Sequence, residues 1–516
     1  MNQFEKSLNG ILLKVKNRLD NLIQCNDGEY YVVDPIDGSA IEGHYGASHA
    51  AVGYLIFSQL FDDDDAEKKS KHLIESIINR WDIISKKPDF HADFNLFALC
   101  IYLKSRRKQI EDSLYDRIRE LVINTSDSKH YTVNWLPMRA YVNRCRYVWT
   151  HDNRYLVTID SIKKHLQSVT YKDYLMDDRI PAGISYNVQY NIATVATLAL
   201  IERDWSFYYC DKMVSSLCRF ILPDGDVNYL GRGCNQLFAW GPWLYLLKTT
   251  GRQHEFDISI EFFNNHIKDS LNNNNLLLNF FPGEERNLWW DYHHFSVYIS
   301  HLFMWLALAA CSCDIDSGIR DKEKRIDNNG LDSGVSIEQT DEYGVVLFNG
   351  RKEYLAEKGP AIYAMWSKKH GVIFKGLFGP WFGAFGNKFS NPVVCMLNFF
   401  GLVKVKHDVS HANNRLLRKL NIIEQTKPYL TIEPCYIEPR ITYQDNKLQI
   451  EYRTSSKSEF LCNIPSLVHE NNYRLLVDGK KVELANGITI NNHYGSCKVF
   501  ESTVLKGKSW IIIITL

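Results

Sequence analysis

Four parts of the N-terminal half of the chain combine polar, aromatic and glycine residues where an apolar helical pattern begins or ends. They are residues 37–49, residues 134–139, the coupled segments 185–191 and 223–243, and residues 284–298. Helix ends leave backbone groups without partners and often line binding clefts. Each part is therefore a candidate contribution to a functional site.

The first part leads into an apolar helical run. His44, Tyr45 and His49 stand at its start and are predicted to line a cleft, with His44 and Tyr45 contacting substrate. A loop of helix-capping residues has a similar composition, so a structural role stays open.

The second part joins Asn134 to Trp135, with Arg139 one helical turn later. An asparagine side chain can donate to a substrate carboxylate, and an arginine can pair with it. The alternative is a capping asparagine, a core tryptophan and a surface arginine.

The coupled segments contain the densest group of candidates. An Asp224-Gly225 turn precedes a predicted helix whose start offers hydrogen-bond donors and indole rings. The candidates here are Asn187, Tyr190, Arg232, Asn235, Gln236, Trp240 and Trp243. A plain turn followed by a core stripe of tryptophans is the alternative interpretation.

The fourth part places two adjacent histidines after a Trp-Trp-Asp run. His293 and His294 offer a base near neutral pH, and Trp289 and Tyr292 are predicted to contact substrate. A metal site would need more carboxylates or histidines at helical spacing. Acid–base catalysis or substrate contact is therefore favoured, and the sequence predicts neither a metal nor a cofactor.

The elements that must position these residues are predicted from apolar periodicity. Apolar residues recur at three- and four-residue steps from residue 3 onward, which predicts about ten to twelve helices before residue 315. Later segments rich in β-branched and aromatic residues predict strands, and Asp478-Gly479 predicts a two-residue hairpin turn. We predict a helical domain at 1–315, a linker at 316–336 and a β-domain at 337–516.

Composition narrows the possible partners. Basic and acidic residues are equal at 60 each, and the zero net charge argues against a nucleic-acid binder. Aromatic residues make up 13% of the chain, which suits stacking on sugar faces as well as a large core. No apolar run approaches the roughly 20 residues of a membrane span. No export signal is visible and the cysteines are scattered, so a soluble cytoplasmic protein is predicted.

Together, the Asn-Trp motif, the Asp-Gly turn before a polar and aromatic helix, the histidine-rich segment and the strand-rich second half resemble the heparinase II/III-type polysaccharide lyases. The resemblance covers nearly the whole chain at the level of architecture. It implies an N-terminal (α/α) toroid, an incomplete barrel of helical hairpins, followed by an antiparallel β-sandwich. It also implies cleavage of an acidic polysaccharide or oligosaccharide that contains uronic acid, by β-elimination.

This chemistry explains the residue types. The site must neutralise the substrate carboxylate, remove the proton from the adjacent carbon and protonate the departing glycosidic oxygen. By the resemblance, Asn134 corresponds to the asparagine that neutralises the carboxylate, and Arg232 would bind the acidic sugar. The acid–base candidates are Tyr190, His293 and His294. The tryptophans expected to stack on flanking sugar rings are Trp240, Trp243 or Trp289.

Two features depart from the family pattern. After the Asp-Gly turn, several such lyases have a histidine and later a tyrosine, whereas this chain has Tyr229, Arg232, Phe238 and Trp240. The second departure is that no export signal is visible, whereas enzymes that degrade external polysaccharide are usually exported. Two other functions therefore stay open. One is a non-catalytic glycan-binding protein of a polysaccharide pathway. The other is a glycoside hydrolase on the same toroid that uses two carboxylates among Asp93, Asp226, Glu284, Glu285 and Asp291.

Overall fold

The computed structural model describes residues 3–33, 38–87, 90–105, 112–177, 188–229, 237–272, 295–311, 333–348, 361–378, 440–444, 447–460, 463–466, 472–492, 495–501 and 505–515. No helix within these ranges is both long and apolar enough to cross a membrane.

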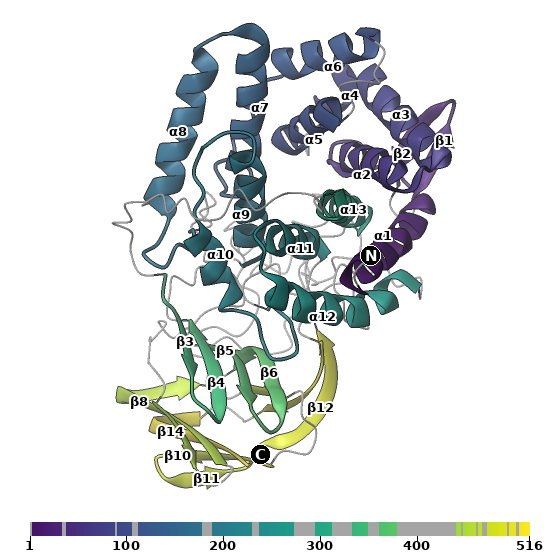
Figure 1. Ribbon diagram of the computed structural model, residues 1–516. Coiled ribbons are helices and arrows are strands. Elements are labelled where there is room, and N and C mark those ends of the chain that lie inside the picture. The colour runs from purple at the N-terminus through teal and green to yellow at the C-terminus, as the bar shows by residue number, and fades with distance from the viewer. Residues whose placement is uncertain are drawn as a thin grey trace, which may run out of the picture.

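Among the described residues of the N-terminal part, six helices form the inner layer of a ring (Figure 1). Each inner helix contacts the next, and the last, α13, contacts the first, α2. The ring is therefore closed, which corrects the prediction of an incomplete barrel. The inner helices are α2 (Gly46–Phe61), α5 (Ala92–Ser105), α7 (Leu136–Thr150), α9 (Val188–Glu202), α11 (Trp240–Thr249) and α13 (Phe295–Cys311).

A second layer of helices packs around the outside of the ring (Figure 1). A single helical turn, α4 (Trp81–Ile84), follows the outer helix α3, and a short 3-10 turn, η1 (Leu237–Ala239), precedes α11. The outer helices are α1 (Gln3–Asp20), α3 (Asp64–Asn79), α6 (Asp112–Asn124), α8 (Arg154–Val169), α10 (Asp211–Cys218) and α12 (Gln253–Asn272).

The sequence determines which layer a helix joins. In the inner helix α9, every residue from Val188 to Ile201 is buried. The outer helix α8 buries only Ile159, Ile162, Leu166 and Val169, at three- and four-residue spacing. A helix that is apolar on all sides must be covered on all sides, whereas an amphipathic one needs cover on one face.

Glycine allows α11 and α13 to approach closely. A Cβ atom at Gly241 would lie 2.8 Å from Trp305 Cβ and 3.0 Å from the carbonyl oxygen of Leu302. Gly241→Ala is therefore expected to lower the free energy of unfolding by about 1–3 kcal/mol, measured by urea denaturation. Gly10→Ala is the control, because nothing lies within 4 Å of a Cβ there and alanine favours helix α1 by up to about 1 kcal/mol. Equal effects of the two changes would contradict this account.

The described residues of the C-terminal part form antiparallel sheets. The first sheet contains, in spatial order, β3 (Val335–Gln339), β4 (Tyr343–Phe348), β5 (Ala361–Ser367) and β6 (Gly371–Phe378). The second has the order β11 (Lys480–Val482), β10 (Asn472–Val477), β14 (Leu505–Thr515), β8 (Lys447–Phe460) and β7 (Arg440–Gln444). A third joins β12 (Ala485–Asn492), β13 (Gly495–Glu501) and β9 (Asn463–Ser466).

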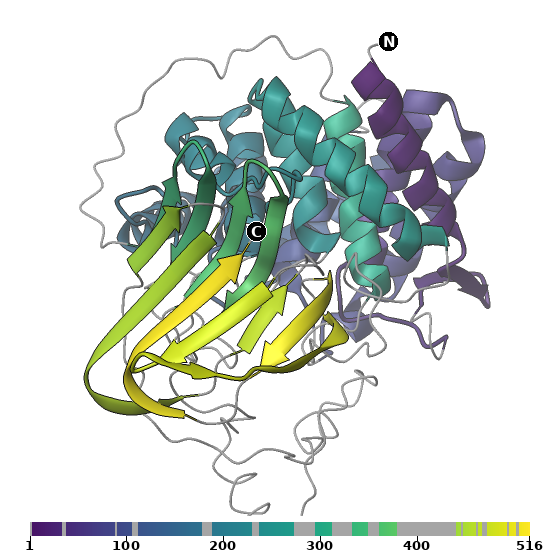
Figure 2. The ribbon, with the colours of Figure 1, turned by 90° about the horizontal axis from the view of Figure 1, so that it is seen from below.

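The first sheet has one face toward the helical ring and one toward the second sheet. Val346 and Ala364 belong to the core of the helical part, whereas Val345 and Met365 share a separate core with Trp510 of β14. Successive side chains of a strand point to opposite faces, so one strand can serve both cores. Figure 2 shows the sheets packed beside the helices.

These findings confirm a helical part followed by antiparallel sheets. The β-sandwich and the domain limits 1–315, 316–336 and 337–516 stay predictions, and β3 begins inside the predicted linker. The predicted hairpin is confirmed between β10 and β11, where Asp478 and Gly479 have φ of 48° and 78°. An unpredicted hairpin joins β1 (Ile23–Asn26) to β2 (Glu29–Val32).

Candidate functional site

Aromatic and imidazole rings from all six inner helices, or from the residues directly before them, meet at one end of the helical ring. We call this group the aromatic cluster. Its members are Tyr45, His91, Phe94, Trp135, Tyr190, Phe238, Tyr298 and His301.

Short distances between ring centroids make the cluster continuous. Tyr45 stacks on Phe94 at 4.3 Å, and Phe94 lies 5.2 Å from Trp135. On the opposite side of the ring, Phe238 stacks on His301 at 4.1 Å and lies 6.0 Å from Tyr190. Phe94 and His301 link the two groups at 6.4 Å.

The sequence order explains why these residues meet. Outer and inner helices alternate along the chain, so the segments that lead into the inner helices gather at one end of the ring. Tyr45 directly precedes α2, and Asn134 and Trp135 precede α7. The loop before α5 is tied to the loop before α2, because the His91 amide donates to the Gly43 carbonyl over 3.0 Å.

Sequence reasoning missed part of the aromatic cluster. His91 stands directly before an apolar helix, as Tyr45 does, and this parallel is the signal that could have identified it. Phe94 and His301 lie inside apolar helical runs, where the pattern indicates core residues only.

Asn134 is the most unusual polar residue at this end. Its side chain is buried, with 3% of the residue exposed, and its Oδ1 atom has no hydrogen-bond partner in the described part of the chain. Leaving a buried polar atom unpaired costs about 1–3 kcal/mol, so such atoms are rare in folded proteins. A ligand that hydrogen-bonds to the carboxamide would remove this cost.

Two phenols, those of Tyr45 and Tyr190, belong to the aromatic cluster at this end of the ring. Burial raises the pKa of Tyr45 well above its usual value, and the neighbouring Tyr190 raises it further. Tyr45 therefore keeps its proton at neutral pH and can act as a donor. The ring of His44 lies 4.4 Å from that of His91 and 6.4 Å from that of Tyr45, so the predicted contact residues His44 and Tyr45 are neighbours.

Two buried imidazoles lie at the inner side of the aromatic cluster. His49 Nδ1 and His301 Nδ1 are 3.1 Å apart, and His49 Nε2 is 3.3 Å from the Phe94 carbonyl oxygen. Burial lowers the pKa of His49 to about 3 and that of His301 well below its usual value. Both imidazoles are therefore neutral at physiological pH.

Arg139 forms a buried ion pair with Asp93. Its guanidinium donates to Asp93, with Nη2 2.8 Å from Oδ2, and to the carbonyl oxygen of His130. Both members of the ion pair are almost fully buried. Its Nε and Nη2 donors hold α5 and α7 together, and the substrate contact by Arg139 stays a prediction.

Trp240 and Trp243 are core residues as well. Trp240 stacks on Phe262 and Phe263 of α12 at 5.4 Å, and Trp243 Nε1 donates to Ser259 Oγ over 3.0 Å. Both indoles point toward the outer layer and are fully buried. Their burial shows a core role in this structure, and the stacking of either indole on a sugar ring stays a prediction.

The Asp224-Gly225 turn has a structural role that the sequence did not indicate. Lys375, from β6, inserts its Nζ between Asp224 and Asp226, at 2.7 Å and 2.8 Å from their Oδ2 atoms. Gly225 has φ of 93° and packs against the backbone of α12. We call the three charged residues the Lys375 cluster; it fastens the first sheet to the helical part.

The remaining candidates lie outside the described residues. They are Asn187, Arg232, Asn235, Gln236, Trp289, Tyr292, His293 and His294, together with the carboxylates Glu284, Glu285 and Asp291. Among the described residues, no group of three or more His, Cys, Asp or Glu side chains is arranged to hold a metal ion.

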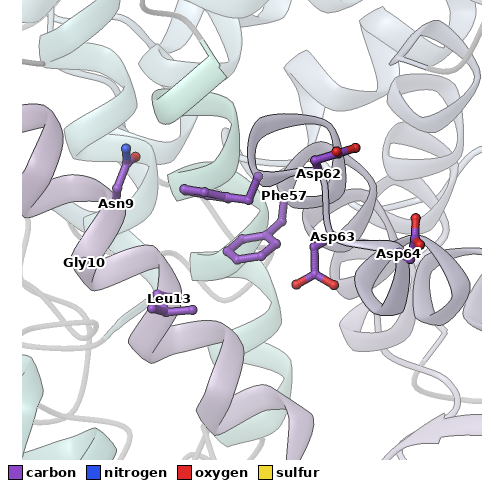
Figure 3. A pocket seen from close by; sticks show the side chains of 8 residues that line it. Asn9, Gly10, Leu13, Phe57, Asp62, Asp63 and Asp64 are labelled. Carbon is purple, nitrogen blue, oxygen red and sulfur yellow. The ribbon is translucent and has the colours of Figure 1, made fainter.

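A separate open pocket of about 620 Å³ lies between α1 and the C-terminal end of α2 (Figure 3). Leu13 and Phe57 form its apolar floor, and Asp62, Asp63 and Asp64 lie at its rim. Because α2 has 16 residues, this pocket is about 24 Å from the end that carries Tyr45. It is not the site that the sequence predicted.

Comparison with known proteins gives fold-level likenesses only. No family model matches the chain, and no curated protein matches it. Among solved structures, a polysaccharide lyase matches at 11% identity and a TM-score of 0.43, over 61% of this chain and 100% of its own. The GH76A α-1,6-mannanase from Salegentibacter sp. HEL1_6 matches at 14% identity and a TM-score of 0.41, over 60% of this chain and 99% of its own. A glycosyl hydrolase of family 88 from Bacteroides vulgatus matches at 12% identity and a TM-score of 0.41, also over 60% of this chain and 99% of its own.

At these identities and TM-scores the likenesses carry no functional assignment. The heparinase II/III-type resemblance and the choice between lyase and hydrolase therefore rest on the site itself.

Proposed function

We propose that the protein is a lyase that cleaves a polysaccharide or oligosaccharide containing uronic acid by β-elimination. The observation that carries this proposal is the buried Asn134 carboxamide, whose oxygen has no partner among the described residues. It lies beside Trp135 at the end of the ring where phenols and imidazoles gather.

Asn134 is suited to neutralising the substrate carboxylate. Its amide can turn to present the NH2 group, which donates to a carboxylate oxygen and stabilises the negative charge that develops there. The inner helices also begin at this end, and helix N-termini carry partial positive charge that favours an acidic sugar. Both effects acidify the proton on the adjacent carbon.

Proton transfer falls to the phenols and histidines of the site. One group removes the proton from the carbon next to the carboxylate; a carbon–carbon double bond forms and the bond to the glycosidic oxygen breaks. A second group gives a proton to that oxygen. Among the described residues, Tyr190 is our candidate for proton transfer, and the protonated Tyr45 lies beside it. His293 and His294 remain candidates for proton transfer from the sequence.

Two of the five carboxylates considered for a hydrolase are bound in ion pairs. A hydrolase needs two carboxyl groups facing the scissile bond. Asp93 is bound by Arg139 and Asp226 by Lys375, both inside buried ion pairs. Neither is available to a sugar, which leaves Glu284, Glu285 and Asp291 as the hydrolase candidates.

Asn134→Ala is expected to lower turnover by about 10²–10³-fold, the usual effect of removing one donor that stabilises developing negative charge. The measurement is the absorbance of unsaturated uronate over a panel of uronate-containing glycans. Asn124→Ala, at the exposed end of α6, is the matched control and should leave turnover unchanged. Undiminished turnover in Asn134→Ala would rule out the proposed role.

The same panel separates the other functions. New reducing ends without the unsaturated chromophore would identify a hydrolase. Binding without any product across the panel would identify a glycan-binding protein.

Tyr190→Phe is expected to lower kcat by about 10²-fold or more, because it removes the phenolic proton and keeps the ring. Tyr208→Phe is the matched control, since Tyr208 is a buried tyrosine outside the aromatic cluster that donates to Thr170 Oγ1 over 2.9 Å. It should cost about 1 kcal/mol of stability and leave kcat unchanged. Equal kcat in the two variants would exclude Tyr190 from proton transfer.

A further inference from the structure

The buried pair His49 and His301 joins the first and last inner helices. These residues are 252 positions apart in sequence, and their Nδ1 atoms are 3.1 Å apart across the α2–α13 contact that closes the ring. The imidazoles meet at their Nδ1 edges with an interplanar angle of 26°, and Phe238 stacks on one face of His301.

The surroundings of the pair determine where each proton lies. A backbone carbonyl can only accept, so the contact between His49 Nε2 and the Phe94 oxygen requires a proton on Nε2. A neutral His49 then has a bare Nδ1, which must accept from His301 Nδ1–H. A neutral His301 in turn has a bare Nε2, and that atom has no hydrogen-bond partner among the described residues.

Among the described residues, no charged side chain raises the pKa of either histidine toward an imidazolium. Burial is the main cause of the lowered pKa of each histidine, and His49 adds to the effect on His301. Among the described residues, the titratable side chain in ring contact with both histidines is Tyr45, directly before α2, and His91 on the loop before α5 lies behind it, in contact with Tyr45. The charged pair at this end, Asp93 with Arg139, is satisfied internally.

The pair also contacts a site residue. Tyr45 lies one helical turn before His49, with ring centroids 4.7 Å apart, and meets His301 edge to face at 5.9 Å. Ring contacts with His49, Phe94 and His301 therefore orient the phenol.

We propose that His49 and His301 are positioning residues: each fixes the other in one neutral tautomer, and together they hold Tyr45 in the aromatic cluster and α2 against α13. The part of this proposal that concerns Tyr45 and turnover rests on the proposed function. The part that concerns the tautomers and the closure of the ring is independent of that function.

The first test is the tautomeric state, read from nitrogen-15 chemical shifts of labelled histidine in the full chain at neutral pH. We expect His49 to be protonated at Nε2 and His301 at Nδ1, with assignment by loss of signals in single variants. The opposite pattern, or rapid averaging between tautomers, would overturn the proposal whatever the activity of the protein.

The second test compares His301→Asn with His301→Leu, two side chains of nearly equal shape. The asparagine amide can place a donor where Nδ1–H stood, whereas leucine cannot. Amide hydrogen exchange in the first turns of α2 and α13 should accelerate by about tenfold or more in the leucine variant and stay near wild type in the asparagine variant. Equal exchange in both variants would show that the pair only fills space.

Turnover adds a third readout. If the wild type cleaves a uronate glycan, the leucine variant should lose about tenfold or more in kcat with little change in KM, and the asparagine variant should recover most of it. If the wild type cleaves no uronate glycan, the proposed lyase function fails, but the first two tests still decide whether His49 and His301 fix each other's tautomer and close the ring. The failure of one proposal is therefore distinguishable from the failure of the other.

Discussion

Lys375→Met is expected to lower the free energy of unfolding by about 3–5 kcal/mol, because it leaves the carboxylates of Asp224 and Asp226 without their cation. Lys375 has only 3% of its side chain exposed and Asp226 none, so water cannot replace the lost partner of Asp226, whereas Asp224 is 35% exposed and stays partly solvated. The carboxylates also raise the pKa of Lys375 against the opposing effect of burial, which keeps the lysine charged.

Urea denaturation measures this effect, and Lys104→Met provides the matched control. Lys104 pairs with Asp204 at the surface with 57% of its side chain exposed, so losing it should cost less than about 1 kcal/mol. The double variant Lys375→Met with Asp226→Asn should recover part of the loss, because it removes one of the two uncompensated charges. A small effect of Lys375→Met, similar to that of Lys104→Met, would show that the Lys375 cluster does not fasten the sheet.

Lowering the pH from 7 to 5 is expected to remove about 4 kcal/mol of stability through His49 and His301, about 2 kcal/mol for each. Their folded pKa values lie below the unfolded value of about 6.5, that of His49 at about 3. Below pH 6.5 the unfolded chain therefore binds protons that the folded chain does not. Stability falls as the pH falls, until the folded pKa is reached.

The measurement is the free energy of unfolding as a function of pH in wild type and in His301→Asn. Removing one imidazole should reduce the loss between pH 7 and pH 5 by about 2 kcal/mol. His151→Asn is the control, because His151 is exposed and its φ of 57° suits asparagine. An unchanged pH dependence in His301→Asn would contradict neutral burial of the pair.

Much of the architecture could be predicted from the sequence. The three- and four-residue spacing predicted the helices, the later β-branched runs predicted the sheets, and Asp478-Gly479 predicted the hairpin with two positive φ angles. Part of the candidate site was predicted too: Tyr45, Asn134 and Tyr190 come to one end of the ring. They do so because each lies at the start of an inner helix.

The partners of the polar and aromatic residues could not be predicted in this way. Arg139 and Trp240 have side chains of the kinds that bind sugars. In the structure, however, Arg139 pairs with Asp93 and Trp240 packs on α12. The composition around the Asp224-Gly225 turn predicted a binding site. In the structure, the turn instead forms ion pairs with Lys375, which is 149 residues from Asp226 in the sequence.

The sequence by itself therefore determined the kind of each element and the place of the site segments before the inner helices, since periodicity and turn chemistry act over a few residues. Only the tertiary structure decided that the ring closes, that His49 meets His301, and which charges neutralise each other. Such contacts join residues that are far apart in the chain, and their free energy depends on burial and distance, which no local pattern contains.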